Sequence, residues 1–225
     1  MTKEQFAQIE NYMLSCMDDS AHDPHHVYRV LYYAMELAQG EAVNRDILIT
    51  ACLLHDIGRK EQFEDPTVCH AAAGAQKAEK FLRALGWAQE DIHQVCHCIR
   101  AHRFSKKSPP ETMEAKILFD ADKLDVVGVA GVARTLLYQG TMGQSLYTLT
   151  PEGTVSDGTA QEIPSFFQEY KRKLEKLYTG FLTEKGLQIA LNRQGAAQRF
   201  YEELYAELNH GYQTGKALLH SVLED

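Results

Sequence analysis

The chain has 225 residues, of which 44% are hydrophobic and 24% are charged, and its formal net charge is −8. This length and composition predict one globular domain, and the negative charge argues against stable nucleic-acid binding over a broad surface. The sequence contains no run of about 18 apolar residues, so we expect no membrane span.

The N-terminal segment and the cysteines indicate the cellular compartment of the protein. The first segment, MTKEQFAQIENYMLS, is mixed polar and lacks the apolar core of a signal peptide. The five cysteines show no framework spacing, so we expect them to be reduced thiols. Both observations favour a cytoplasmic protein.

Most of the chain carries apolar residues at spacings of three and four, which is typical of amphipathic helices. Asp23 and Pro24 form a good helix start, as N-cap and first helical residue, and this helix is expected to end at Gly40. Further helices are expected over about 44–56, 66–85 and 90–103, and from near Glu111 through the sequence AKILFDADKLDVVG.

The second half contains the main interruption of this pattern. The segment 139–162 holds most of the clustered glycines and is expected to form a long loop or lid. Helical periodicity resumes at Pro164 and predicts C-terminal helices over about 163–223. Strand alternation is scarce, so the pattern predicts an all-α protein.

Two metal-capable side chains lie at the end of one apolar helix. The sequence ACLLHDIGRK places His55 and Asp56 after an apolar run and just before Gly58. A helix C-terminus carries partial negative charge and favours a cation. Successive residues lie about 100° apart around a helix, so both side chains can lean toward one point. The alternative is that the histidine only caps the helix, with the aspartate on the surface.

Other helices supply further candidate ligands. His26 lies one turn into its helix, on the apolar face. The sequence FDADKLD contains three carboxylates, of which Asp122 and Asp125 share a face whereas Asp120 points elsewhere. Imidazoles and carboxylates together form a mixed nitrogen and oxygen set that suits a divalent cation.

The order His26, His55-Asp56, Asp122 resembles that of the HD-domain phosphohydrolase superfamily. Four stretches over roughly residues 20–135 carry this resemblance: HDPHHVYRV, LLHDIGRK, CHAAAGAQKAEKFL and DADKLDVVGVAGVARTLLY. The last is similar to a small bacterial branch of stand-alone HD hydrolases, and SFFQEYKRKLEKL and IALNR extend the likeness to most of the chain. The resemblance implies a compact all-α bundle over about 20–135 with additional C-terminal helices, a divalent metal, and hydrolysis of a phosphoester or phosphoanhydride.

Carried over residue by residue, the resemblance makes His26, His55, Asp56 and Asp122 the metal ligands. A bound dication lowers the pKa of its water from about 15.7 to about 7, which would give Asp56 a catalytic role. Asp125 is a second catalytic candidate, because it could orient a ligand or the attacking water; the alternative is that it supports a ligand from behind.

His70 and His102 have several candidate roles. In dinuclear branches of the superfamily, extra histidines hold a second metal that the aspartate of the HD pair bridges, and these two could do the same. They could instead bind substrate phosphate or cap their helices.

Four basic residues are candidates for substrate binding. Arg59 takes the place of the lysine in the H-D-I-G-K form, Arg29 lies in an H-x-x-R arrangement, and Lys123 follows a metal aspartate. Arg134 lies in an apolar helix, where its guanidinium could bind phosphate or pair with an aspartate. Because other branches have a glutamate at the position of Arg59, their acid–base scheme is not carried over.

The position of Arg134 depends on whether its helix is continuous. It follows Asp122 by twelve residues, about 18 Å along a straight helix. It could therefore reach the same phosphate only if the helix breaks at Gly128 or Gly131.

These observations predict a divalent-metal-dependent phosphohydrolase for a nucleotide or a related small phosphorylated molecule. The ligand set does not distinguish among Mn, Mg, Fe, Co, Ni and Zn. The alternatives are a cyclic-dinucleotide or other phosphodiesterase, against which the lack of a G-Y-P signature counts, and a metal-containing nucleotide-sensing protein. His22, His25, His93 and His97 are expected to be solvated rather than ligands.

Overall fold

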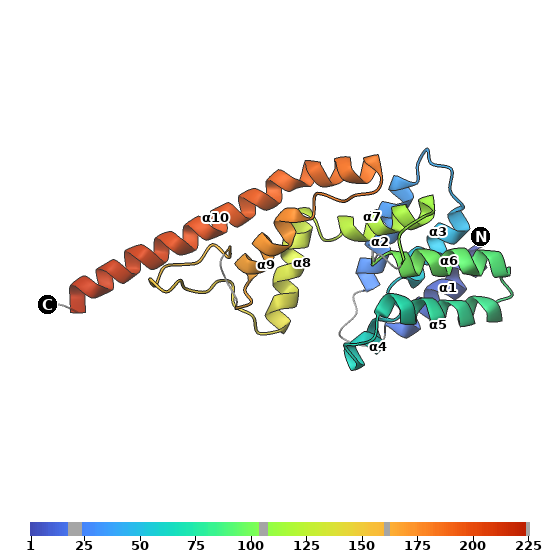
Figure 1. Cartoon of the computed structure of the whole chain (residues 1–225), viewed down its shortest axis with the longest axis horizontal. Coiled ribbons are helices and arrows are strands. Elements are labelled where there is room, and N and C mark those ends of the chain that lie inside the picture. The colour runs from blue at the N-terminus through green and yellow to red at the C-terminus, as the bar shows by residue number, and fades with distance from the viewer. Residues whose placement is uncertain (18–23, 104–107, 160–162, 224–225) are drawn as a thin grey trace. The chain divides into compact units, whose positions relative to one another are not determined.

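The protein is described by a computed structural model that covers residues 1–17, 24–103, 108–159 and 163–223 (Figure 1). Its helices are α1 (Lys3–Cys16), α2 (Pro24–Leu37), α3 (Arg45–Leu54), α4 (Arg59–Glu64), α5 (His70–Ala84), α6 (Gln89–Ala101), α7 (Met113–Leu124), α8 (Gly128–Thr141), α9 (Phe166–Arg172), the 3₁₀ helix η1 (Leu174–Lys176) and α10 (Glu184–Leu223). Within the described ranges, β-pairing is limited to two isolated bridges. The all-α prediction is therefore confirmed, whereas Asp23 and His22 lie outside the described residues.

The domain expected from the length contains two compact units. Unit 1 comprises Met1–Asp125 and Phe181–Gly186, and unit 2 comprises Val126–Gly180 and Leu187–Asp225. The two units are described separately below.

Helix α3 lies at the centre of unit 1. It contacts α1, α2, α6 and α7, because its apolar residues are buried around its whole circumference. The helix begins where the Asn44 side chain accepts hydrogen bonds from the amides of Asp46 and Ile47. Its last turn consequently delivers His55 and Asp56 into the interior of the unit.

Two helix boundaries in unit 1 differ from the prediction for local reasons. The Asp65 carboxylate accepts hydrogen bonds from the amide and hydroxyl of Thr67, which holds the chain in a turn, so α5 begins at His70 and not at residue 66. The short helix α4 was not predicted.

The helix expected to pass through DVVG ends at Leu124 instead. Val127 is extended, with φ −113° and ψ 160°, and Gly128 has φ +73°, a left-handed conformation that favours glycine. The β-branched Val126-Val127 pair tolerates this extended backbone better than a helix interior. The break separates the helix of Asp122 from that of Arg134.

Asp120 holds the segment 181–186 within unit 1. Its fully buried carboxylate accepts hydrogen bonds from the amides of Leu182 (2.9 Å) and Thr183 (2.7 Å) and from the Thr183 hydroxyl (2.6 Å). That hydroxyl in turn accepts from the amide of Gly186 at 3.1 Å, in the first turn of α10. Asp120 therefore points away from Asp122 and Asp125, as the sequence predicted.

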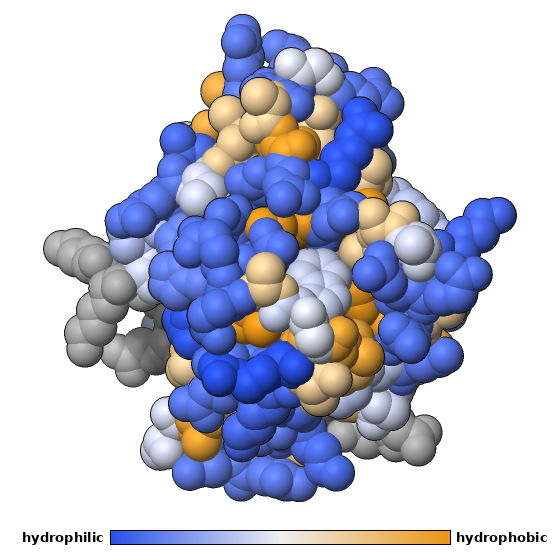
Figure 2. All heavy atoms as spheres, turned by 90° about the vertical axis from the view of Figure 1, so that its right-hand side faces the viewer, coloured by the Kyte–Doolittle hydropathy of each residue, from blue (hydrophilic) through white to orange (hydrophobic). Residues whose placement is uncertain are grey.

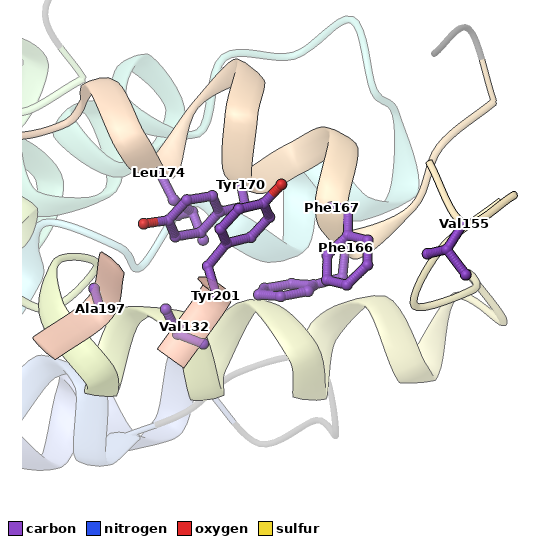
Figure 3. Close-up of a cluster of buried hydrophobic side chains, with 8 residues drawn as sticks. All are labelled: Val132, Val155, Phe166, Phe167, Tyr170, Leu174, Ala197 and Tyr201. Atoms are coloured by element: carbon purple, nitrogen blue, oxygen red, sulfur yellow. The ribbon is translucent and has the colours of Figure 1, made fainter. Parts of the chain in front are cut away.

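The core of unit 2 is an aromatic cluster (Figure 3). Tyr170 of α9 and Tyr201 of α10 stack with their ring centroids 4.2 Å apart and an angle of 6° between the rings. The cluster comprises Val132, Val155, Phe166, Phe167, Tyr170, Leu174, Ala197 and Tyr201.

The loop expected over 139–162 begins later, because α8 continues to Thr141. Its described part is tied to unit 2 by the buried Val155 and by Gly158. Gly158 has φ +88°, and a Cβ at this position would overlap the backbone of Phe167.

The surface shows few extended apolar regions in the view of Figure 2, where hydrophilic side chains predominate and apolar ones form small groups. Exposed apolar side chains do occur near the end of α10, at Leu218, Leu219, Val222 and Leu223. Among the described residues, no helix combines the length and the apolar character that a membrane crossing requires.

Replacing Asp120 by alanine should lower the free energy of unfolding by about 2–3 kcal/mol, because three donors lose a charged acceptor in a buried place. Urea denaturation of the variant and of Asp65→Ala measures the effect. Asp65 is exposed, and among the described residues its carboxylate accepts hydrogen bonds from Thr67 alone, so its variant should lose less than about 1 kcal/mol. Equal losses in the two variants would contradict the role given to Asp120.

Candidate metal centre

The turn after α3 places His55 and Asp56 in the interior of unit 1. His55 is fully buried, and its Nδ1 lies 2.7 Å from the carbonyl oxygen of Cys52, three residues earlier. The turn packs closely on α5: a Cβ at Gly58 would overlap the carbonyl oxygen of His70 and the amide of Gly74. Glycine is therefore required at position 58 for the turn to meet α5.

His26 faces this turn from α2. Its Nε2 lies 3.4 Å from Nε2 of His55, 3.2 Å from Oδ1 of Asp122 and 3.7 Å from Oδ2 of Asp56. The structure therefore brings together the four residues that the resemblance makes metal ligands. His26, His55 and Asp56 also form a buried group whose ligand atoms all lie within 4.8 Å of one another.

The hydrogen bonds of the two histidines determine which ring nitrogen is directed toward the other candidate ligands. Nδ1 of His55 donates to a carbonyl, and Nδ1 of His26 lies 2.7 Å from the carboxylate of Asp125. In neutral imidazoles held this way, both Nε2 atoms carry lone pairs, and these face each other. Two nitrogens bound to one ion at about 2.0–2.1 Å would lie about 3–3.4 Å apart, so the observed spacing suits a shared cation.

A second group of ligand atoms lies on the other oxygen of Asp56. Its Oδ1 is 3.7 Å from Nε2 of His70 and 3.6 Å from Nε2 of His102, and these two nitrogens are 3.2 Å apart. The three residues form a second buried group suited to a metal. Asp56 therefore belongs to both groups, one through each carboxylate oxygen.

The two histidines of the second group are held differently. His102 follows α6 and donates from Nδ1 to the carbonyl of Ile99 at 2.6 Å, which repeats the arrangement of His55. Nδ1 of His70 is buried and has no hydrogen-bond partner among the described residues. Of the four histidines, His70 therefore has the least firmly defined tautomer.

Burial and charge prepare these groups to bind a cation. Burial lowers the pKa of His55 to about 4, and burial together with Arg59 lowers that of His70 to about 3. Burial works to raise the pKa of Asp56, but the positive charge of Arg59, which donates to its Oδ1, lowers that pKa. Neutral imidazoles beside an ionised carboxylate are the forms that bind metal.

Asp125 lies behind His26. Besides His26, its carboxylate accepts from Arg29, at 2.6 Å from Nε and 3.1 Å from Nη2. Asp125 thus contacts His26 at Nδ1, the ring nitrogen other than Nε2. Of its two candidate roles, this arrangement favours support of a ligand over contact with the attacking water.

The other basic candidates are distributed over both units. Arg59 donates from Nε to Oδ1 of Asp56 at 2.9 Å. Lys123 lies over the rings of Phe119 and Phe181, 5.5 and 4.8 Å from their centroids. Arg134 lies on α8 in unit 2, beyond the helix break.

Several other predictions concern residues outside these groups. His25 and His93 are exposed, whereas His97 is half-buried and accepts from the amide of Glu111. Among the described residues, the cysteines are all free thiols, as expected.

Lys77 is a residue that the sequence analysis missed. It donates to the carbonyl of Ile57 at 2.7 Å and pairs with Glu61 at 2.9 Å, which fixes the turn after Asp56 against α5. Lys77 follows His70 by seven residues, or two turns of α5, and this spacing could have predicted that both lie on the same face of that helix.

Comparisons with known proteins agree with this geometry. A family model for the HD domain matches residues 25–127. The uncharacterized protein YpgQ of Bacillus subtilis is 27% identical over 204 residues, which cover 80% of this chain and 97% of YpgQ.

Solved structures share the fold. The structure of an HD-superfamily hydrolase from Bacillus thuringiensis is 28% identical and superposes with a TM-score of 0.70, covering 92% of this chain and 98% of its own. A structure of YpgQ in complex with ADP is 25% identical, also with a TM-score of 0.70, and covers 91% of this chain and 98% of its own.

Gly58→Ala should lower the free energy of unfolding by about 3 kcal/mol, because the added methyl group forces the turn away from α5. Gly74→Ala is the matched control, since a Cβ there meets its nearest neighbours at 3.4 Å or more and α5 gains helix propensity. Its stability should stay within about 1 kcal/mol of the parent protein. Thermal and urea unfolding measure both, and a harmless Gly58→Ala substitution would contradict the close packing.

Asp125→Asn should weaken the binding of Mn²⁺ by about 10–100-fold, because the charged partner of the His26 ring is lost. Isothermal titration calorimetry on the metal-free protein measures this affinity. Glu90→Gln removes an exposed carboxylate of α6 and should leave the affinity unchanged. An Asp125→Asn protein that binds Mn²⁺ as tightly as the parent would exclude the supporting role.

Proposed function

We propose that the chain, whose residues 25–127 match the model of the HD domain, is a divalent-metal-dependent phosphohydrolase of nucleotides or related small phosphorylated molecules. HD-superfamily hydrolases among its structural relatives and its histidine–aspartate groups support a metal-dependent hydrolase. The observation that carries the proposal is the shared Asp56 carboxylate, with two imidazole Nε2 atoms on each side.

His26, His55, Asp56 and Asp122 are the residues that would hold the first ion, and Asp56, His70 and His102 those that would hold a second. A divalent ion bound here supplies Lewis acidity and a water of lowered pKa. The protein supplies the orientation, because hydrogen bonds to Cys52, Ile99 and Asp125 hold three of the rings with Nε2 toward Asp56.

Arg59 is the basic residue that we propose to bind the substrate phosphate. Its guanidinium already lies beside Asp56, and the side chain is 40% exposed, so it can turn toward a bound anion. A planar guanidinium can donate two parallel hydrogen bonds to phosphate oxygens. Arg29 is held by Asp125, which gives it a supporting role behind the ligands.

The relatives favour a nucleotide as the substrate. YpgQ binds ADP in its solved structure, and this chain covers 98% of that protein. A diphosphate has the charge that divalent ions and an arginine neutralise together. A hydrolysis screen of nucleoside mono-, di- and triphosphates and cyclic dinucleotides, with Mn²⁺, Mg²⁺, Co²⁺ and Zn²⁺ and with product identification, tests the proposal. Nucleotide binding without turnover under every metal would favour a sensing protein instead.

Asp56→Ala should abolish the hydrolysis found in this screen, because both groups lose their common ligand. The helical circular-dichroism signal should persist, since removing a buried carboxylate costs no helix hydrogen bond. Glu90→Ala provides the control for loss of a carboxylate at an exposed site. Undiminished turnover by a folded Asp56→Ala protein would rule out the proposed centre.

A further inference from the structure

The two oxygens of Asp56 have different surroundings. Oδ2 lies 3.7 Å from Nε2 of His26 and 3.7 Å from Nε2 of His55. Oδ1 faces the other pair of histidines, at 3.7 Å from His70 and 3.6 Å from His102. The same carboxylate therefore divides the cluster into two places for a cation, which we call the Oδ2 site and the Oδ1 site.

Arg59 contacts only one of these oxygens. Its Nε donates to Oδ1 at 2.9 Å, and the guanidinium also contacts Gln62 at 3.5 Å. Arg59 can reach Oδ1 because it is the first residue of α4 and follows Asp56 by only three residues. The positive charge of Arg59 thus lies on the Oδ1 side of the bridging carboxylate.

We infer that Arg59 makes the Oδ1 site bind a divalent cation more weakly than the Oδ2 site. An ion at the Oδ1 site must either lie beside a guanidinium, with repulsion between like charges, or displace it from Oδ1. The Oδ2 site has no such contact with Arg59, and it gains a further carboxylate from Asp122. The protein therefore loads the Oδ2 site first.

A phosphate removes this asymmetry. It offers Arg59 acceptor oxygens that carry as much charge as Asp56, and the half-exposed side chain can turn to meet them. The guanidinium then leaves Oδ1, so the second ion and the phosphate favour each other's binding. This last step rests on the proposed function, whereas the asymmetry between the sites does not.

The test is a Mn²⁺ titration of the metal-free protein without substrate, followed by the electron paramagnetic resonance signal of free Mn²⁺. The parent protein should bind one ion strongly and a second weakly or not measurably. In Arg59→Gln, the second step should become about tenfold tighter, because the opposing charge is gone, while the first step stays unchanged. The double variant Arg59→Gln/His102→Ala should lose the second step.

Two control variants distinguish the effect of the Arg59–Asp56 contact from a general effect of positive charge, and folding is checked separately. Lys60→Gln removes the same charge from the exposed neighbouring position and should leave both steps as in the parent protein. Arg59→Lys keeps the charge and should keep the weak second step. Circular dichroism and thermal unfolding confirm that each variant is folded.

Three results would overturn the inference. They are a second step in Arg59→Gln no tighter than in the parent protein, an equal gain in both steps, and a gain in Lys60→Gln as large as in Arg59→Gln. Because the titration needs no turnover, its outcome is independent of the hydrolysis screen. A protein that hydrolyses no phosphate compound can still show the asymmetry, and an active one can lack it.

Discussion

Asp56 is a carboxylate buried between four imidazoles, and the site depends on groups that stabilise its negative charge. Burial alone would favour its protonated form. Arg59 offsets this cost of burial at Oδ1, to which its Nε donates a hydrogen bond at 2.9 Å. The position of the carboxylate depends in turn on Gly58, without which the turn could not lie against α5.

Helix α7 and its C-cap Asp125 connect this site to the rest of unit 1, because Asp122 and Asp125 both reach His26 whereas Asp120 points away from them. Asp122 faces His26 at 3.2 Å, and Asp125 contacts the same ring from the other side. Asp120 binds the returning segment 181–186. One short sequence thus provides a candidate ligand, the support for another ligand, and an anchor for the chain.

Much of the site could be predicted from the sequence, because its candidate ligands belong to regular helices and short motifs. His55 and Asp56 follow an apolar helix, and the separation of Asp120 from Asp122 and Asp125 follows from helix periodicity. The sequence left open whether the helix breaks at Gly128, since this break depends on a left-handed Gly128 whose amide donates to the hydroxyl of Tyr178, fifty residues away. A hydrogen bond between residues so far apart in the chain leaves no local pattern in the sequence.

His55 and His102, at the C-termini of α3 and α6, are held by hydrogen bonds that depend less on the identity of other residues than the hydrogen bond of His26 does. His55 and His102 each donate to the main-chain carbonyl three residues earlier, at Cys52 and Ile99. Every amino acid provides that carbonyl, so side chains at these two positions can diverge without disturbing the rings, provided that the helix persists. His26 depends on a carboxylate that only particular residues supply. The ring orientations of His55 and His102 thus depend on their positions at the end of a helix. The orientation of His26 depends on Asp125, a residue far away in the sequence.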